Sequence, residues 1–492
     1  MTQENDTVRV CHDCIGDSFL ADEVKEKGHR GLCSYCGKRR KALTLEELAE
    51  RIHEVLQEHF KLTLNETPWR RSGYPVADLI ANMAGLDEEI AEDVRALLSE
   101  PHEYEAMTNG AENPYDSDAH YEEYRPDELG FIETWDAVRR EIRSRSRFFS
   151  TSAEDALRSI FGNLNTLRTS DDQPVIRKIT PDGEERFIWR ARTAQSTRGL
   201  KDILGAPVRE IGPPTSRLAK VGRMNAAGIP VFYGALDEDT CVAEVRAPVG
   251  SYVVVAKFEV LRPLRLLDFD SLTKIYVERN HFDPTYASHV GHASFLRRLV
   301  REMSRPIMPG DEAFEYLVTQ AVAEYLAHKI EPRLDGIIFH SSQTDGTGRN
   351  VVLFNHACGV EPYDLPIGAE LTFSGLPKVT KLTFFSHLSD EDDKDYAVPD
   401  ITVCETMPSE PSEKVSPTER PESPIDIRPL GVFDSTLPWD EDESEEDSEP
   451  PTYASPTLRL DMESVVVLDI KGVQYNSKRR NVHRYRSTKG ES

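Results

Sequence analysis

Long apolar runs are missing from this sequence: no part of its 492 residues approaches eighteen apolar residues in succession. A helix that crosses a bilayer needs about 20 predominantly apolar residues, so we expect no membrane span. The opening residues, MTQENDTVRV, also lack the basic stretch and the apolar stretch of a secretion signal. These absences lead us to expect a cytoplasmic protein that has no membrane partner.

Apolar residues are scarce overall. They make up 38% of the chain, and the mean hydropathy is −0.50, values that are typical of folded domains averaged with a polar, unfolded segment. That segment is Leu388–Glu449, where 21 acidic residues against 4 basic ones contribute about −17 of the net charge of −27. We expect a disordered, acidic, Pro-rich segment over residues 388–455.

Apolar character returns after this segment. Thr457–Met462 and Ser464–Ile470 have the composition of two short strands, and the residues from Tyr475 onward are basic. We therefore expect terminal strands and a basic tail over residues 456–492, with the two strands forming a hairpin that joins the preceding domain. The acidic segment would then be an internal insertion.

Clustered basic residues are also few. Neutralisation of nucleic-acid phosphates requires grouped Lys and Arg, so the acidic balance argues against nucleic acid as a partner. The dense basic run Arg139–Arg147 could contact phosphates, but a solvated helix face is the simpler interpretation. A Gly-rich strand-to-helix fingerprint is absent, which argues against a Rossmann or P-loop nucleotide site.

The seven cysteines are an odd number, and four of them form two C-x2-C pairs separated by eighteen residues. This pattern fits a tetrahedral Zn²⁺ site better than disulfides. The expected zinc ligands are Cys11, Cys14, Cys33 and Cys36, within a zinc knuckle over residues 1–40. Free thiols, or a ligand set in which His12 or His29 replaces one cysteine, are the alternatives. Because four thiolates leave no open position for a substrate, we expect a structural Zn²⁺.

Helical periodicity follows the cysteine pairs. Thr44–Glu47 has the pattern of a capping box, and the apolar residues after it recur at helical spacing. Further helices are expected at Val76–Ala84, Asp87–Ser99, Ile132–Ser146 and Ala153–Leu164. The sequence therefore predicts an all-α helical module over residues 41–170.

From Arg186 the pattern changes to short strands with unevenly inserted helices. Strands are expected at Phe187–Thr193, Pro230–Leu236, Tyr252–Val260, Leu264–Phe269, Gly336–His340 and Val351–Phe354. Helices are expected at Asp239–Arg246, Ser294–Ser304 and Glu312–Ile330. This order predicts a mixed α+β domain over residues 180–387, in a multidomain α+β protein.

Four residues in this domain stand in a pattern that suggests chemistry. A Gly-flanked loop carries Arg223, the next strand carries Tyr233, a helix delivers Glu244, and Ser341 ends a distant apolar strand. Taken singly, each residue has an ordinary explanation as a surface charge, a core ring, a helix-surface carboxylate or a turn residue. Spacing alone would favour those explanations.

The same residues carry a resemblance to a known family. The loop Gly222–Asn225, the run Pro230–Tyr233 followed by Ala243–Val245, and the strand end Asp335–Ser341 followed by Gly348 and Val351–Phe354 stand in the order of the RES domain family. The sequence resembles that family, which is named for its Arg, Glu and Ser residues and whose bacterial toxin members degrade NAD⁺. The resemblance implies an ADP-ribosyltransferase-like fold. The upstream zinc and helical modules are similar to the HEPN/RES N-terminal arrangement.

The resemblance also implies roles for individual residues. Glu244, Arg223, Tyr233 and Ser341 would be catalytic, and the residues that bind NAD⁺ would be Arg190, Arg223, Asn225, Tyr233 and Ser341. The implied reaction is cleavage of the nicotinamide–ribose bond of NAD⁺ by a glycohydrolase or phosphorylase acting as a toxin or defence effector. Because uncontrolled loss of NAD⁺ would kill a host, we also expect an antitoxin-like or regulatory protein partner.

Three other functions stay open on the sequence alone. The chain could transfer ADP-ribose to a protein, or it could be a non-enzymatic adaptor that only holds a nucleotide. The third function is RNA cleavage, because HEPN domains are often ribonucleases whose motif is an Arg and a His separated by four to six residues. Ile132–Leu164 contains many arginines but no histidine, which argues against RNA cleavage from this part of the helical module.

Overall fold

A computed structural model describes most of the chain. The described residues are 7–63, 72–109, 112–123, 129–146, 149–278, 280–305, 307, 310–344, 346–363, 365, 369–377, 400–407 and 455–472. None of the helices in this part of the chain combines the length and the apolar character needed to cross a bilayer.

The chain divides into two compact units. Unit 1 comprises residues 1–176 and Phe269–Arg305, and unit 2 comprises Arg177–Asp268 and residues 306–492. Residues 269–305 fall inside the range 180–387, yet they pack within unit 1. They form α10 (Phe269–Thr273) and α11 (Tyr286–Ser304). The expected domain ranges themselves stay a prediction.

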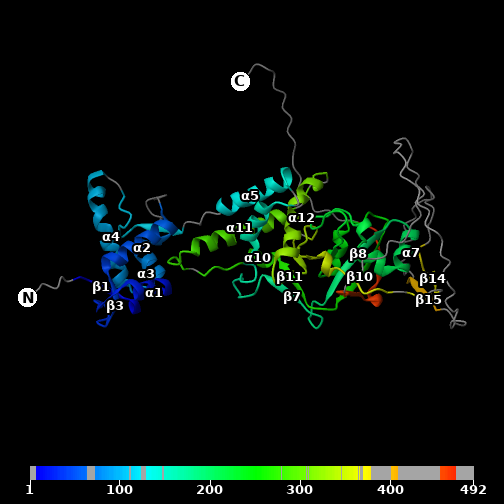
Figure 1. Cartoon of the computed structure of the whole chain (residues 1–492), viewed down its shortest axis with the longest axis horizontal. Helices are drawn as coiled ribbons and strands as arrows, with labels where there is room; N and C mark the ends of the chain where they lie inside the picture. The colour runs from blue at the N-terminus through cyan, green and yellow to red at the C-terminus, as the bar shows by residue number, and fades with distance from the viewer. Residues whose placement is uncertain are drawn as a thin grey trace, which may run out of the picture. The chain divides into compact units, whose positions relative to one another are not determined.

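The first part of unit 1 combines a small sheet with helices α1 to α4 (Figure 1). The sheet has the order β1 (Arg9–Cys11), β3 (Arg39–Thr44) and β2 (His29–Leu32), and the helices are α1 (Ser18–Lys27), α2 (Leu45–His59), α3 (Val76–Ala84) and α4 (Glu88–Asn109). Thr44 and Glu47 form the expected capping box. Val10 and Leu20 share one core with Ile52 and Ile80, so the cysteine-bearing segment packs directly on the helices.

The expectation of an all-α module is wrong in one respect. A second sheet, β4 (Phe60–Leu62), β6 (His120–Glu123) and β5 (Tyr74–Pro75), lies among the helices. These strands are two to four residues long, too short to show a period of two in the sequence. The remaining helices of this region are α5 (Leu129–Ser144) and α6 (Thr151–Phe161).

Helix α4 is longer than expected, because it continues through Pro101 to Asn109. A proline usually ends or kinks a helix near the residue before it, and the expectation stopped at Ser99 for that reason.

Unit 2 is built on a nine-stranded sheet (Figure 1). Its strands, in spatial order, are β16 (Leu458–Leu460), β10 (Tyr252–Val260), β8 (Phe187–Ala194), β9 (Phe232–Ala235), β13 (Arg349–Leu353), β12 (Gly336–His340), β11 (Leu264–Asp268) and β7 (Ile176–Ile179), with β17 (Val466–Asp469) also paired to β10. β11 and β12 are parallel. The six expected strands of this domain are confirmed, and the mixed α+β architecture with them.

Helices cover both faces of this sheet. On one face, α7 (Thr197–Gly205) and α8 (Pro207–Ile211) bury Leu200 and Ile211 in a core that contains Phe232. On the other face, α9 (Glu238–Glu244) buries Cys241 against Ala235. The long helix α12 (Glu312–Lys329) precedes β12. Because α9 ends at Glu244, that carboxylate lies on the face opposite α7 and α8.

The two terminal strands join the preceding domain as expected, but they do not form a hairpin. Leu458–Leu460 pairs with Phe258–Val260, and Val466–Asp469 pairs with Tyr252–Val255, so both strands pair with β10 one after the other. A short 3-10 turn separates them, and Ser464 Oγ accepts a hydrogen bond from Lys257 N at 2.9 Å. The nine residues of β10 offer enough length for two short partners.

The expectation of disorder is wrong for one stretch of residues 388–455. Thr402–Thr406 forms strand β15, which pairs antiparallel with β14 (Glu370–Ser374). This two-stranded sheet packs near α7, since a Cβ on Gly205 would lie 3.6 Å from Leu371 Cδ1. Residues 388–399 and 408–454, and the basic tail from residue 473, lie outside the described residues.

Candidate functional site

Glu244 and Ser341 meet in unit 2, although 97 positions separate them in the sequence. α9 is capped by Asp237, which accepts a hydrogen bond from Thr240 N, and the helix ends at Glu244. Ser341 follows β12 directly. Its Oγ donates a hydrogen bond of 2.6 Å to Glu244 Oε1, and Asn350 Nδ2 donates a second one of 2.7 Å to the same oxygen.

This network fixes the direction of the carboxylate. Ser341 is fully buried, and its Oγ accepts a hydrogen bond from Gln343 N at 3.1 Å, which turns the hydroxyl hydrogen toward Glu244. Both hydrogen bonds to Glu244 from the described residues end on Oε1. Glu244 itself is half-buried. The second oxygen, Oε2, is therefore the one that can act on a ligand.

Tyr233 is joined to the glycine-flanked loop. Its hydroxyl donates to Asn225 Oδ1 at 3.0 Å and accepts from Met224 N at 3.0 Å. Burial raises the pKa of Tyr233 to about 12, so the phenol stays protonated at neutral pH. A Cβ on Gly222 would lie 2.5 Å from Asn225 Oδ1 and 2.7 Å from the Tyr233 hydroxyl oxygen. This close approach requires glycine at position 222.

α12 holds the same loop from the other side. Thr319 Oγ1 donates to the Arg223 carbonyl at 2.5 Å, and Gln320 Nε2 donates to the Gly222 carbonyl at 2.8 Å. The half-buried Arg223 places its guanidinium 5.8 Å from the centre of the Tyr316 ring. The loop thus presents a permanently charged planar group whose main chain is held in place.

Tyr233 and Asn350 share one face of the sheet. β9 and β13 are antiparallel, with Tyr233 opposite Val352 and Ala235 opposite Asn350. Residues opposite each other, and residues two apart on one strand, point to the same face. That face is the one covered by α9, where Ala235 packs with Cys241. The register therefore brings the tyrosine, the amide and the carboxylate of Glu244 to one side of the sheet.

Arg190 lies elsewhere. Its register partner Ala256 belongs to the core under α7 and α8, and the Arg190 guanidinium lies 4.7 Å from the centre of the Phe232 ring. Nη1 donates to the Tyr233 carbonyl at 2.8 Å. Burial, with the neighbouring Arg192, lowers the pKa of this guanidinium. The structure gives Arg190 a contact with the main chain of Tyr233, and its contact with NAD⁺ stays a prediction.

Asn350 is the site residue that the sequence analysis missed. The expected strand began at Val351, where the apolar pattern begins, which is two residues after the observed start of β13 at Arg349. The sequence did contain a signal, because asparagine is rare in strands and Asn350 stands directly before the apolar run. Its partner could not be read from the sequence, because Glu244 lies 106 positions away.

The residues of this site fall within a match to a known family. A family model described as the RES domain matches residues 187–373. The chain contains a RES domain. The matched residues include every residue of the site from Arg190 to Asn350. RES domains are generally enzyme domains that act on NAD, so the match supports NAD as a substrate at this coarse level.

The N-terminal part has its own match. A second model, described as HEPN/RES N-terminal domain 1, matches residues 26–156. This confirms the resemblance to a RES domain that follows a HEPN/RES N-terminal module. No curated protein and no solved structure matches the chain.

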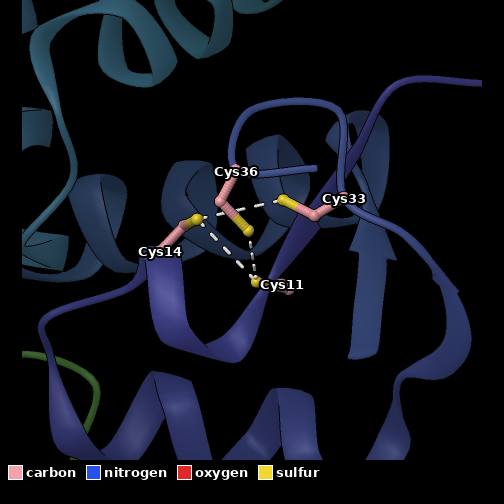
Figure 2. A group of neighbouring side chains, drawn as sticks. All are labelled: Cys11, Cys14, Cys33 and Cys36. Carbon is pink, nitrogen blue, oxygen red and sulfur yellow. Dashed lines mark hydrogen bonds between the residues drawn. The ribbon is translucent and has the colours of Figure 1, made fainter. Parts of the chain in front are cut away.

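The four paired cysteines of the N-terminal module converge (Figure 2). Their sulfur atoms all lie within 4.8 Å of one another. The Sγ–Sγ distances are 3.7 Å from Cys11 to Cys14, 3.6 Å from Cys11 to Cys36 and 3.8 Å from Cys14 to Cys33.

These distances fit a metal better than disulfides. Four thiolates at about 2.3 Å from a tetrahedral Zn²⁺ would have sulfurs about 3.8 Å apart, whereas a disulfide needs about 2.05 Å. All four cysteines are free. The group that could hold a metal among the described residues consists of these four cysteines and contains no histidine.

The module also contains an arginine–histidine pair outside the range Ile132–Leu164. Arg95 and His102 lie on α4 with six residues between them, within the spacing of the HEPN ribonuclease motif. Both approach Tyr115, since Arg95 Nη1 donates to its carbonyl at 2.6 Å and the His102 ring lies 5.8 Å from its ring. His53 Nδ1 is hydrogen-bonded to the Tyr115 hydroxyl.

Proposed function

We propose that the RES domain cleaves the nicotinamide–ribose bond of NAD⁺ and passes the ADP-ribosyl group to water or phosphate. The single observation that carries this proposal is the Glu244 carboxylate, which Ser341 and Asn350 hold by Oε1 at 2.6 and 2.7 Å. The family match supports the class of substrate.

The chemistry needs such a carboxylate. When the bond between C1′ of the ribose and the nicotinamide nitrogen breaks, its electron pair leaves with nicotinamide, which becomes neutral. The ribose then carries positive charge, as in other glycosidic cleavages. Glu244 would stabilise this charge through Oε2. An oxygen of water or phosphate forms the new bond to C1′, and water releases its proton to solvent.

The other residues would bind and orient the dinucleotide. Arg223 offers a planar guanidinium that suits the two phosphates. Tyr233 would offer a ring face whose negative charge attracts the cationic nicotinamide. The hydrogen bonds of its hydroxyl with Asn225 and Met224 hold the ring in place. Ser341 donates to Glu244, so we assign it the positioning of the carboxylate. Asn225 supports the loop.

The test is incubation of the purified chain with NAD⁺, in the presence and absence of phosphate, followed by mass measurement of the products. ADP-ribose indicates hydrolysis, its 1″-phosphate indicates phosphorolysis, and a protein that gains the ADP-ribosyl mass indicates transfer to protein. Binding of NAD⁺ with no product would contradict the proposed enzyme and favour an adaptor.

A second candidate function belongs to the HEPN/RES N-terminal domain. Arg95, His102 and His53 gather around Tyr115, and an arginine with histidines can stabilise and protonate a phosphodiester during RNA cleavage. Arg95 is also bound to Glu92 through Nη2 at 2.7 Å, which occupies part of its guanidinium. RNA cleavage that His102→Ala abolishes and Glu244→Gln leaves unchanged would establish this function.

A further inference from the structure

Asn350 is a buried polar residue in the middle of the RES sheet. It is 8% exposed and lies on β13, between β9 and β12, opposite Ala235 on one side and Phe339 on the other. Asparagine disfavours strands, and burial of an amide is costly unless hydrogen bonds compensate it. A residue of this kind in a central strand requires a partner, and that partner is Glu244.

The geometry around Asn350 favours this one contact. The opposite residue, Ala235, is fully buried and has only a methyl side chain, which leaves room for α9 to approach the sheet. Asn350 Nδ2 then reaches Glu244 Oε1 at 2.7 Å. Among the described residues, no second acceptor takes a hydrogen bond from this amide.

Asn350 and Ser341 act on the same oxygen from different strands. Ser341 Oγ lies 2.6 Å from Glu244 Oε1, and its direction is set by Gln343 N. Two donors on one carboxylate oxygen restrict rotation of the carboxylate about its terminal torsion, which is otherwise broad. Oε2 is consequently held in one direction.

We propose that Asn350 is a positioning residue of the RES site: its amide and the Ser341 hydroxyl together hold Glu244 Oε1, and so aim Oε2 at the ribose. This inference rests on the proposed cleavage of NAD⁺.

Two variants test the role. Asn350→Ala removes the donor, and we expect kcat for NAD⁺ cleavage to fall about tenfold to hundredfold, the range of a hydrogen bond to a charged group, with KM changed less than about threefold. Asn350→Asp places a second carboxylate beside Glu244. The two acids then share a proton, so the acid limb of the kcat–pH profile should move to higher pH by at least about one unit.

The control is Asn355→Asp, which makes the same change at an exposed asparagine whose amide donates to the Pro230 carbonyl at 3.2 Å. It should keep the wild-type pH profile. Circular dichroism and thermal unfolding check that all variants are folded. An Asn350→Asp profile that matches wild type in shape, with only its height reduced, would show a purely structural amide and overturn the inference. Wild-type chain that does not consume NAD⁺ would instead refute the proposed function.

Discussion

Substitution of Gly222 by alanine tests the architecture of the Arg223 loop. The new Cβ would lie 2.5 Å from Asn225 Oδ1 and 2.7 Å from the Tyr233 hydroxyl oxygen, both shorter than any normal carbon contact. Overpacking costs about 1–3 kcal/mol, and the two hydrogen bonds of the Tyr233 hydroxyl contribute about 1 kcal/mol each. We expect a loss of about 2–5 kcal/mol in the free energy of unfolding of the RES domain.

Two assays test this prediction. At about 2–4 °C per kcal/mol, thermal unfolding should shift down by at least about 4 °C. KM for NAD⁺ should rise, because Arg223 moves with the loop. Gly199→Ala is the matched control, since its nearest neighbour is Ser196 Oγ at 3.5 Å and alanine suits its helix. A Gly222→Ala protein with unchanged melting temperature and KM would refute the packing that we describe.

Two further predictions concern the N-terminal unit. Elemental analysis should find about one zinc ion per chain. Cys33→Ser should lose this zinc together with folded structure, whereas the control Cys404→Ser, at an exposed cysteine, should keep it. Equal zinc content in the two variants would contradict the site. Burial lowers the pKa of His59 and His292 below the usual 6.5, so the unfolded chain binds these protons more tightly. The stability that these two histidines contribute to unit 1 should be fully present above about pH 6.5 and should be lost as the pH falls. Urea unfolding at about pH 5 and 7.5 measures this difference, and equal unfolding midpoints would disprove it.

Much of the fold could be predicted because local signals were strong. Val76–Ala84 begins after Pro75 and ends before Gly85, which adopts a positive φ of 60°, and its limits were predicted correctly. The strands Tyr252–Val260 and Gly336–His340 are apolar runs with clear ends. Strand β6 was missed because HYEE has one large buried side chain, Tyr121, and no visible alternation.

The site could be predicted only in part. Motifs in the sequence indicated Glu244 and Ser341, and the structure joins them. The contribution of Asn350 depends on the register of β13 against β9, which no local pattern specifies. The position of Arg190 on the other face of the sheet depends in the same way on its pairing with Ala256.

The paired terminal strands show a related limit. Their existence was visible in the sequence, but their partner was not, since β10 can pair with either strand or with both. The choice follows from the length of β10 and from the turn at Met462–Ser464.

The proposed cleavage of NAD⁺ depends above all on the carboxylate of Glu244. The most direct measurement is the turnover of NAD⁺ by Glu244→Gln, with Glu238→Gln on the same helix as the control. We predict that Glu244→Gln, folded as wild type, loses at least about 10²-fold in kcat, while the control keeps wild-type turnover. Equal turnover by wild type and Glu244→Gln would contradict the account.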